Sequence, residues 1–192
     1  MNERFNQLSE DRQAQILNGA MQAFAEYGYD KCSMADVAMY AGVSKPLIFH
    51  YFTSKIELFD YLNKYANTLK GQAQQKPAIK PDEDLLEAFA KTVKQRVAFV
   101  QLNPVAYRFL KQAEFTAHLQ HTDQGSAELL KSDAHRLRKG FIATDVVRLL
   151  GWVGDGFIEE HLRSNSSGRK TLEDLDALLT SLKKMLYKDK HK

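Results

Sequence analysis

The chain has 192 residues, of which 44% are hydrophobic, and 27 Lys and Arg face 24 Asp and Glu. This length suits one compact unit or two small ones, with enough apolar material for a core. Ten Gly and four Pro are few, which argues against a sandwich or barrel with many turns. The mean hydropathy is −0.44 and no long uncharged apolar stretch occurs, so we expect no membrane span. Cys32 is the only cysteine and no apolar leader follows Met1, so we expect a cytoplasmic protein.

Four helices are expected before residue 70, each opened by a serine N-cap. The expected helices span residues 10–27, 34–41, 45–52 and 55–69, with Ser9, Ser33, Ser44 and Ser54 as their caps. Gly28 and Gly42 supply the stops of the first two. Ser54 and Glu57 have the spacing of a capping box, which predicts the start of the fourth.

A polar stretch bracketed by prolines, near residues 71–83, is expected to connect two blocks. Five further helices are expected at residues 84–102, 104–120, 126–139, 144–161 and 171–187. No segment alternates at a period of two residues. The sequence therefore predicts an all-α fold of about nine helices, with an N-terminal three-helix domain at residues 1–54 and a second helical domain at residues 55–192.

The stretch most informative about function is residues 33–52, where two short helices are joined by a turn at Gly42. This is the layout of a helix-turn-helix, whose second helix lies in the major groove of DNA. No acidic residue occurs from Ser44 to Lys55, so nothing there repels phosphate. The side chains suited to DNA are Lys45, His50, Tyr51 and Lys55. The alternative is a helix pair that merely packs, because short pairs with glycine turns occur in any α-bundle.

The N-terminal block is not basic overall. Residues 1–55 hold five basic and six acidic side chains. We therefore expect the helix dipoles and backbone amides at the capped starts near Ser33 and Ser44 to contribute to phosphate binding.

The run SMADVAMYAGVSKPLIFHYFTSKIELF at residues 33–59, with AFAEYGY at residues 23–29, resembles the N-terminal domain of TetR-family transcriptional regulators. The resemblance implies that Ser33 and Lys55 contact phosphate and that Ser44 and Lys45 begin the recognition helix. The expected DNA-binding residues are Ser33, Ser44, Lys45, Leu47, His50, Tyr51 and Lys55. Pro46 stands where the family usually has Gly or a small residue, and Phe49 where Tyr is frequent, so no family contact is carried over to these two.

The resemblance also implies a homodimer whose C-terminal domain binds a small molecule. Two features support the dimer independently: a broad leucine stripe in the last helix and three glycines at 151, 154 and 156 in the helix before it. The expected interface residues are Val146, Leu150, Val153, Phe157, Leu175, Leu179 and Leu182. An ordinary monomer core is the alternative.

The expected effector site is mostly apolar. Its candidate lining residues are Phe89, Val93, Arg96, Tyr107, Phe109 and His118, and plain core packing is the alternative for the aromatic ones. His118 and His121 alone are weak evidence for a metal site, so we expect no metal. We also expect no cofactor and no catalytic residue. Cys32 is a candidate redox sensor, but a buried thiol is the favoured interpretation.

These observations predict a ligand-responsive DNA-binding transcriptional regulator that is not an enzyme. The preferred hypothesis is a repressor, a homodimer on double-stranded palindromic operator DNA, released by a small and mostly apolar effector. The alternative is a helical small-molecule-binding protein or enzyme that does not bind DNA.

Overall fold

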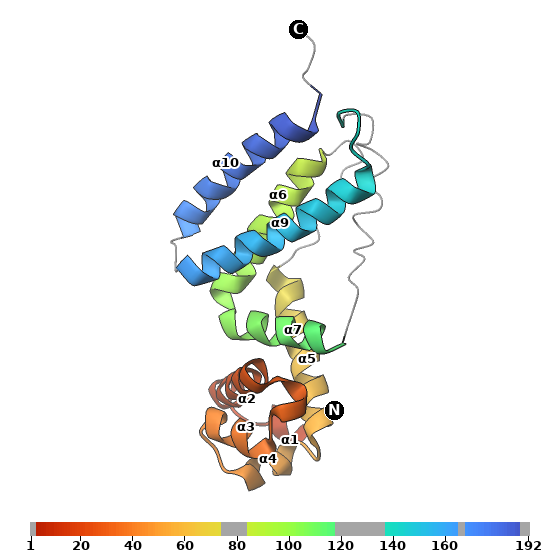
Figure 1. The fold of residues 1–192 in the computed structure, drawn as a ribbon. Helices are drawn as coiled ribbons and strands as arrows, with labels where there is room; N and C mark the ends of the chain where they lie inside the picture. The colour runs from red at the N-terminus through yellow and green to blue at the C-terminus, as the bar shows by residue number, and fades with distance from the viewer. Residues whose placement is uncertain (1–2, 74–83, 118–136, 165–167, 189–192) are drawn as a thin grey trace. The chain divides into compact units, whose positions relative to one another are not determined.

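The computed structural model describes residues 3–73, 84–117, 137–164 and 168–188, and Figure 1 shows the arrangement of their helices. Within these ranges the chain forms nine helices and no strand, which confirms the predicted all-α fold. The helices are α1 (Glu3–Asn6), α2 (Glu10–Lys31), α3 (Met34–Ala41), α4 (Lys45–Tyr51), α5 (Lys55–Ala73), α6 (Leu85–Leu102), α7 (Pro104–Ala117), α9 (Ala143–Ser164) and α10 (Gly168–Leu186). None of the helices in the described ranges is both long and apolar enough to cross a membrane.

The chain divides into two compact units that are not contiguous in sequence. The first consists of Met1–Gln72 and Leu102–Gln120, and the second of Ala73–Gln101 and His121–Lys192. Helices α5 and α7 thus share the first unit with α1 to α4. The functional boundary expected between residues 54 and 55 remains a prediction.

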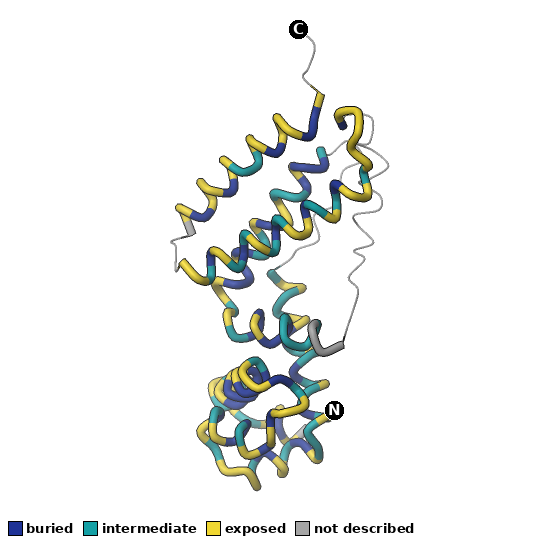
Figure 2. The backbone as a smooth tube through the Cα atoms, in the orientation of Figure 1, coloured by how far each residue is buried: buried dark blue, intermediate teal, exposed yellow. Residues whose placement is uncertain are grey.

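Helix α2 is the central helix of the first unit, and its buried residues are dark blue in Figure 2. A Cβ built on Gly19 would lie only 2.3 Å from the Cα of Ala41, so the backbones of α2 and α3 approach directly at this point. The Gln15 side-chain amide donates to the Ala41 carbonyl oxygen at 2.9 Å beside it. A side chain larger than hydrogen at position 19 would push the two helices apart.

The end of α2 confirms the break expected at Gly28, whose φ of 71° and ψ of 167° lie outside the helical region. A further helical turn follows this kink, so α2 ends at Lys31. The Cys32 backbone N–H donates to the Gly28 carbonyl oxygen at 3.1 Å and closes this turn.

An aromatic cluster joins α2, α5 and α7 within the first unit. The ring of Phe59 lies 5.1 Å from Phe24 and 5.3 Å from Phe109, centroid to centroid. Such edge-to-face pairs contribute beyond the apolar area that they bury. Phe109, expected to line an effector site, is only 1% exposed and is a core residue of this unit.

The second unit is built from α6, α9 and α10 around a separate apolar core. Its buried members are Leu85, Leu86, Ala88, Leu137, Val146, Leu150, Leu182, Leu186 and Tyr187. Polar side chains also link the helices: Arg96 pairs with Asp155, and the Thr171 hydroxyl lies 2.5 Å from Nδ1 of the buried His161.

Local details differ from the expected elements at several points. The short helix α1 was not expected, because four residues carrying one aromatic side chain show no periodicity. The Ser54 hydroxyl accepts from the Glu57 N–H, as in the expected capping box, while the Glu57 carboxylate also accepts from the N–H and hydroxyl of Thr53. Helix α10 begins at Gly168, before the expected start at Thr171.

The helix expected over residues 126–139 lies mostly outside the described residues. The described part, residues 137–139, is not helical. Leu137 instead forms an isolated antiparallel bridge with Tyr187, and the Arg138 N–H donates to the Leu186 carbonyl oxygen at 2.9 Å. The backbone at Leu137 and Arg138 therefore pairs with the end of α10 and not with a neighbouring turn of a local helix.

Gly19→Ala tests the close approach of α2 and α3. We expect it to lower the free energy of unfolding by about 1–3 kcal/mol, the usual cost of forcing a methyl group into a packed contact. Gly71→Ala is the control, since a Cβ there meets nothing within 4 Å and alanine favours the helix. Chemical denaturation of both variants measures the difference, and equal stability of the two would contradict the assigned contact.

Candidate nucleic-acid interface

Helix α3 begins at a complete capping box. The Ser33 hydroxyl accepts from the Asp36 N–H at 3.2 Å, and the Asp36 carboxylate accepts from the Ser33 N–H at 2.8 Å and its hydroxyl at 2.7 Å. These hydrogen bonds from Ser33 lower the pKa of Asp36 below its usual value. Ser33 remains exposed at the start of the helix, as a phosphate contact requires.

The turn between α3 and α4 is fixed by backbone geometry. Gly42 has φ 64° and ψ 35°, the left-handed conformation that glycine adopts without steric cost. The N–H of Val43 donates to the Ala38 carbonyl oxygen at 3.0 Å, which closes the end of α3. Val43 itself is half-buried.

Helix α4 presents a continuous exposed face. The Ser44 hydroxyl caps it by accepting from the Leu47 N–H at 3.3 Å, and Pro46 fits the first turn, where no helical N–H is needed. Ile48 is fully buried and holds the helix to its unit. The exposed residues are Ser44, Lys45, Pro46, Phe49 and His50.

Three of the residues expected to bind DNA are less accessible. Leu47, Tyr51 and Lys55 are half-buried. The ring of Tyr51 lies 5.1 Å from His50 and 5.5 Å from Phe5 of α1, centroid to centroid. Tyr51 therefore connects the exposed His50 with the interior of the unit.

Phe49 belongs to this surface, although no family contact was carried over to it. Phe49 is 41% exposed, and the Lys45 ammonium lies 5.9 Å from the centroid of its ring. The spacing of Lys45 and Phe49, one turn apart on a helix, is the signal that could have identified the pair from sequence.

Lys55 has partners inside its own unit. Its ammonium donates to the main-chain oxygens of Asp30 at 3.3 Å and Cys32 at 3.0 Å, and lies 4.5 Å from the centroid of the Tyr29 ring. Two of its three N–H groups thus fix the corner between α2 and α3, immediately before Ser33.

Cys32 lies at the same corner and is almost completely buried. Burial and, to a smaller extent, the Asp36 carboxylate raise the pKa of its thiol against the opposing effect of Lys55, to a net value of about 11. A thiolate is the reactive form of cysteine, so this thiol is largely unreactive at neutral pH. The arrangement favours the buried-thiol interpretation over the redox sensor.

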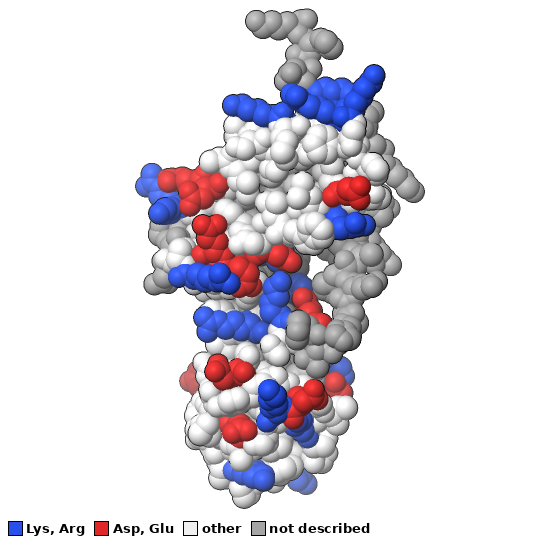
Figure 3. Space-filling model, viewed as in Figure 1, with Lys and Arg blue, Asp and Glu red and all other residues white. Residues whose placement is uncertain are grey.

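Charges of both signs cover the first unit. On the face seen in Figure 3, Lys and Arg alternate with Asp and Glu and do not merge into one basic area. This agrees with the near balance of charge in residues 1–55. Affinity for phosphate here must depend on a few well-placed cations and on the helix N-termini.

The seven residues expected at a dimer interface fall into two groups. Val146, Leu150, Leu175 and Leu182 are buried within the single chain, so they form its core. Val153, Phe157 and Leu179 are half-buried and retain surface. Trp152, which was not assigned to the interface, is 66% exposed on α9.

The expected effector-binding residues are distributed over both units. Phe89, Val93 and Arg96 surround Gly154, with atoms 3.2–3.5 Å from a Cβ built there. Tyr107 and Phe109 belong to the first unit and are buried. His118 lies outside the described residues.

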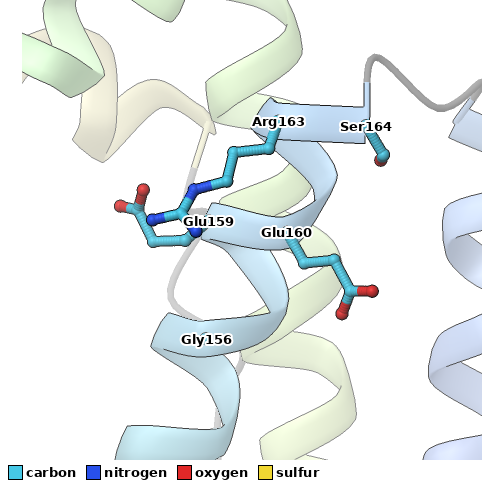
Figure 4. Close-up of a pocket in the computed structure, with 5 residues that line it drawn as sticks. All are labelled: Gly156, Glu159, Glu160, Arg163 and Ser164. Atoms are coloured by element: carbon cyan, nitrogen blue, oxygen red, sulfur yellow. The ribbon is translucent and has the colours of Figure 1, made fainter.

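Two of the hollows formed by described residues lie in the second unit, and the expected effector-binding residues line neither of them. One of 670 Å³ lies along α9, where Figure 4 shows Arg163 extending toward Glu159 while Glu160 points away. The other, of 460 Å³, lies between α9 and α10 beside His161 and Thr171. The described residues hold no group of three or more His, Cys, Asp or Glu arranged to bind a metal ion.

Comparison with known proteins is consistent with this geometry. Residues 16–62 match the family described as bacterial regulatory proteins, tetR family. The chain is 29% identical over 121 residues to the HTH-type transcriptional activator FasR of Mycolicibacterium smegmatis, covering 62% of this chain and 54% of that protein. It is 48% identical over 48 residues to the HTH-type transcriptional repressor Rv1474c of Mycobacterium tuberculosis, covering 25% and 26% of the two chains. The chain thus spans about half and about a quarter of these relatives.

The fold is also found among solved structures. A TetR family transcriptional regulator from Chloroflexus aurantiacus superposes with a TM-score of 0.76, 17% sequence identity and coverage of 97% of this chain and 98% of that one. At 17% identity, this similarity shows that the two chains share a fold and nothing further.

The burial of Cys32 predicts slow alkylation. At pH 8 the folded protein should react with iodoacetamide far more slowly than the unfolded protein, and its rate should rise with pH toward the pKa of about 11. Because Cys32 is the only cysteine, mass spectrometry of the intact chain reports it alone. Equal rates in the folded and the urea-unfolded protein would contradict the placement of this thiol.

Proposed function

This chain is a member of the TetR family of bacterial regulatory proteins, and we propose that it is a DNA-binding transcriptional regulator that responds to a small molecule. The favoured form is a repressor that leaves a palindromic operator when a mostly apolar effector binds. The observation that carries the proposal is the exposed face of α4, which presents Lys45, Phe49 and His50 with no acidic side chain from Ser44 to Lys55.

In this proposal α4 lies in the major groove. Lys45 neutralises phosphate, while His50 contacts base edges or the groove wall and Phe49 packs against apolar groups such as thymine methyls. Ser33 and Ser44 bring the N-termini of α3 and α4 to the backbone on either side. Lys55 contributes a phosphate contact through its third N–H, since the other two hold the corner before α3.

The proposed homodimer uses the exposed sides of α9 and α10. Val153, Phe157 and Leu179 retain apolar surface, and Trp152 adds a large exposed ring. A Cβ built on Gly151 or Gly156 meets nothing within 4 Å, which leaves room for a second chain. A two-fold dimer would set two copies of α4 about 34–36 Å apart, one turn of DNA.

We propose that the effector binds within the second unit, near Gly154. Phe89 and Val93 give this region an apolar wall, and the ion pair between Arg96 and Asp155 offers a polar anchor. Binding here would weaken operator affinity if the effector prefers the conformation that does not fit DNA. A hundredfold loss requires a coupling free energy of about 2.8 kcal/mol.

A mobility shift at several salt concentrations tests the function. The probe is a duplex selected by the protein from a random pool, and a scrambled duplex is the control. We expect nanomolar to micromolar binding that weakens steeply with salt, because phosphate binding releases counterions. Selection of no sequence above background would favour the alternative of a binding protein or enzyme that does not act on DNA.

Lys45→Ala tests the proposed phosphate contact on α4. It should weaken binding to the selected and scrambled duplexes by a similar factor and reduce the slope of log affinity against log salt by about one. Lys64→Ala is the matched control, because it removes the same charge from an exposed position on α5. A slope equal to that of the parent protein would remove Lys45 from the phosphate contacts.

Leu179→Glu tests the dimer. The substitution would bury an unpaired carboxylate between two chains, so monomers should appear in sedimentation at micromolar concentration. Operator affinity should fall as the dimer dissociates, because a monomer contacts one half-site where the dimer contacts two linked half-sites. Ser181→Glu adds the same charge at an exposed position of α10 and should leave the dimer intact. A Leu179→Glu protein that remains dimeric would contradict this interface.

A further inference from the structure

We propose that Phe5 in α1 is a positioning residue that sets the orientation of α4, so that the N-terminal segment of the chain is part of the DNA-binding machinery. This inference rests on the function proposed above. It goes beyond that function because it gives a role to a helix that no sequence pattern indicated.

Phe5 lies at the centre of an aromatic cluster around the end of α4. Its ring lies 5.5 Å from Tyr51, the last residue of α4, and 5.2 Å from Phe52, which caps the helix. It also lies 5.6 Å from Tyr61 of α5, and Tyr61 lies 5.4 Å from Phe52. Phe5 and Phe52 are both 0% exposed, so the contact between these two rings is fully desolvated.

Polar contacts fix α1 on two other helices. The Gln13 side-chain amide of α2 donates to the Leu8 carbonyl oxygen at 2.8 Å and to that of Asn6 at 3.3 Å. The Tyr61 hydroxyl of α5 donates to the Asn6 side-chain oxygen at 3.2 Å. Phe5 is therefore held in place from α2 and α5, independently of α4.

Helix α4 needs such support. It has seven residues, too few for a stable helix in water, and Ile48 is its one buried side chain. Its start is fixed by the turn at Gly42 and the cap at Ser44. Its end is fixed through Tyr51 and Phe52 against Phe5, and Tyr51 in turn contacts His50 on the exposed face. Removing the ring of Phe5 would release the end of α4 that carries His50.

The test compares Phe5→Ala with Phe109→Ala. Both residues are almost fully buried aromatics of the first unit, but Phe109 contacts Phe24 and Phe59 and makes no ring contact with α4. Affinity for the duplex selected by the parent protein is measured at a temperature where circular dichroism shows both variants folded. We expect at least a tenfold loss of affinity for Phe5→Ala beyond that of Phe109→Ala, with an unchanged salt slope, since no phosphate contact is removed.

Amide hydrogen exchange in the DNA-free protein gives a second readout. In Phe5→Ala, the α4 amides should exchange at least tenfold faster relative to those of α3, whereas Phe109→Ala should change both helices alike. If Phe5→Ala does not fold, Phe5→Leu replaces it, because leucine retains apolar volume and removes the ring contacts. Equal loss of affinity in the two variants, or unchanged α4 exchange, would overturn the proposal. A parent protein that selects no duplex would refute the DNA-binding function, while exchange would still decide the role of Phe5.

Discussion

A helix of seven residues has too few internal hydrogen bonds to hold its own shape, so the candidate recognition helix α4 depends on the helices around it. Its start follows α3, which lies against α2 because Gly19 lets the two backbones meet at Ala41. Its end rests on the aromatic cluster around Phe5. The surface that would face DNA is therefore a product of packing elsewhere in the unit, and α2 is the element that most of this packing shares.

The corner between α2 and α3 shows how one cation can serve structure and binding together. Lys55 donates to two main-chain oxygens that would otherwise lack a helical partner, at the position where Cys32 is buried and Ser33 begins the next helix. A lysine in this place stabilises the corner by complementing the C-terminal dipole of α2. Its positive charge also remains next to a proposed phosphate contact, which matters in a domain with little net charge.

The two halves of the chain use their apolar residues differently. In the first unit, aromatic rings from α2, α5 and α7 form one core, which assigns α7 to this unit although it follows α6 in sequence. In the second unit, mainly aliphatic residues of α6, α9 and α10 form the core, together with Leu137 and Tyr187. The leucine stripe of the last helix is broader than one neighbour requires, and the structure divides it between the core, which takes Leu175 and Leu182, and the surface at Leu179.

The sequence by itself determined the helical class, the positions of most helices and the turn at Gly42, because caps, glycines and apolar spacing are local signals. The same local signals identified Lys45 and His50 as exposed residues of a short helix. Only the tertiary structure decided that Phe5 contacts the end of α4, that Lys55 has partners within its unit and that Leu137 and Arg138 pair with the end of α10. These contacts join residues far apart in the chain, and no spacing rule within a single helix contains that information.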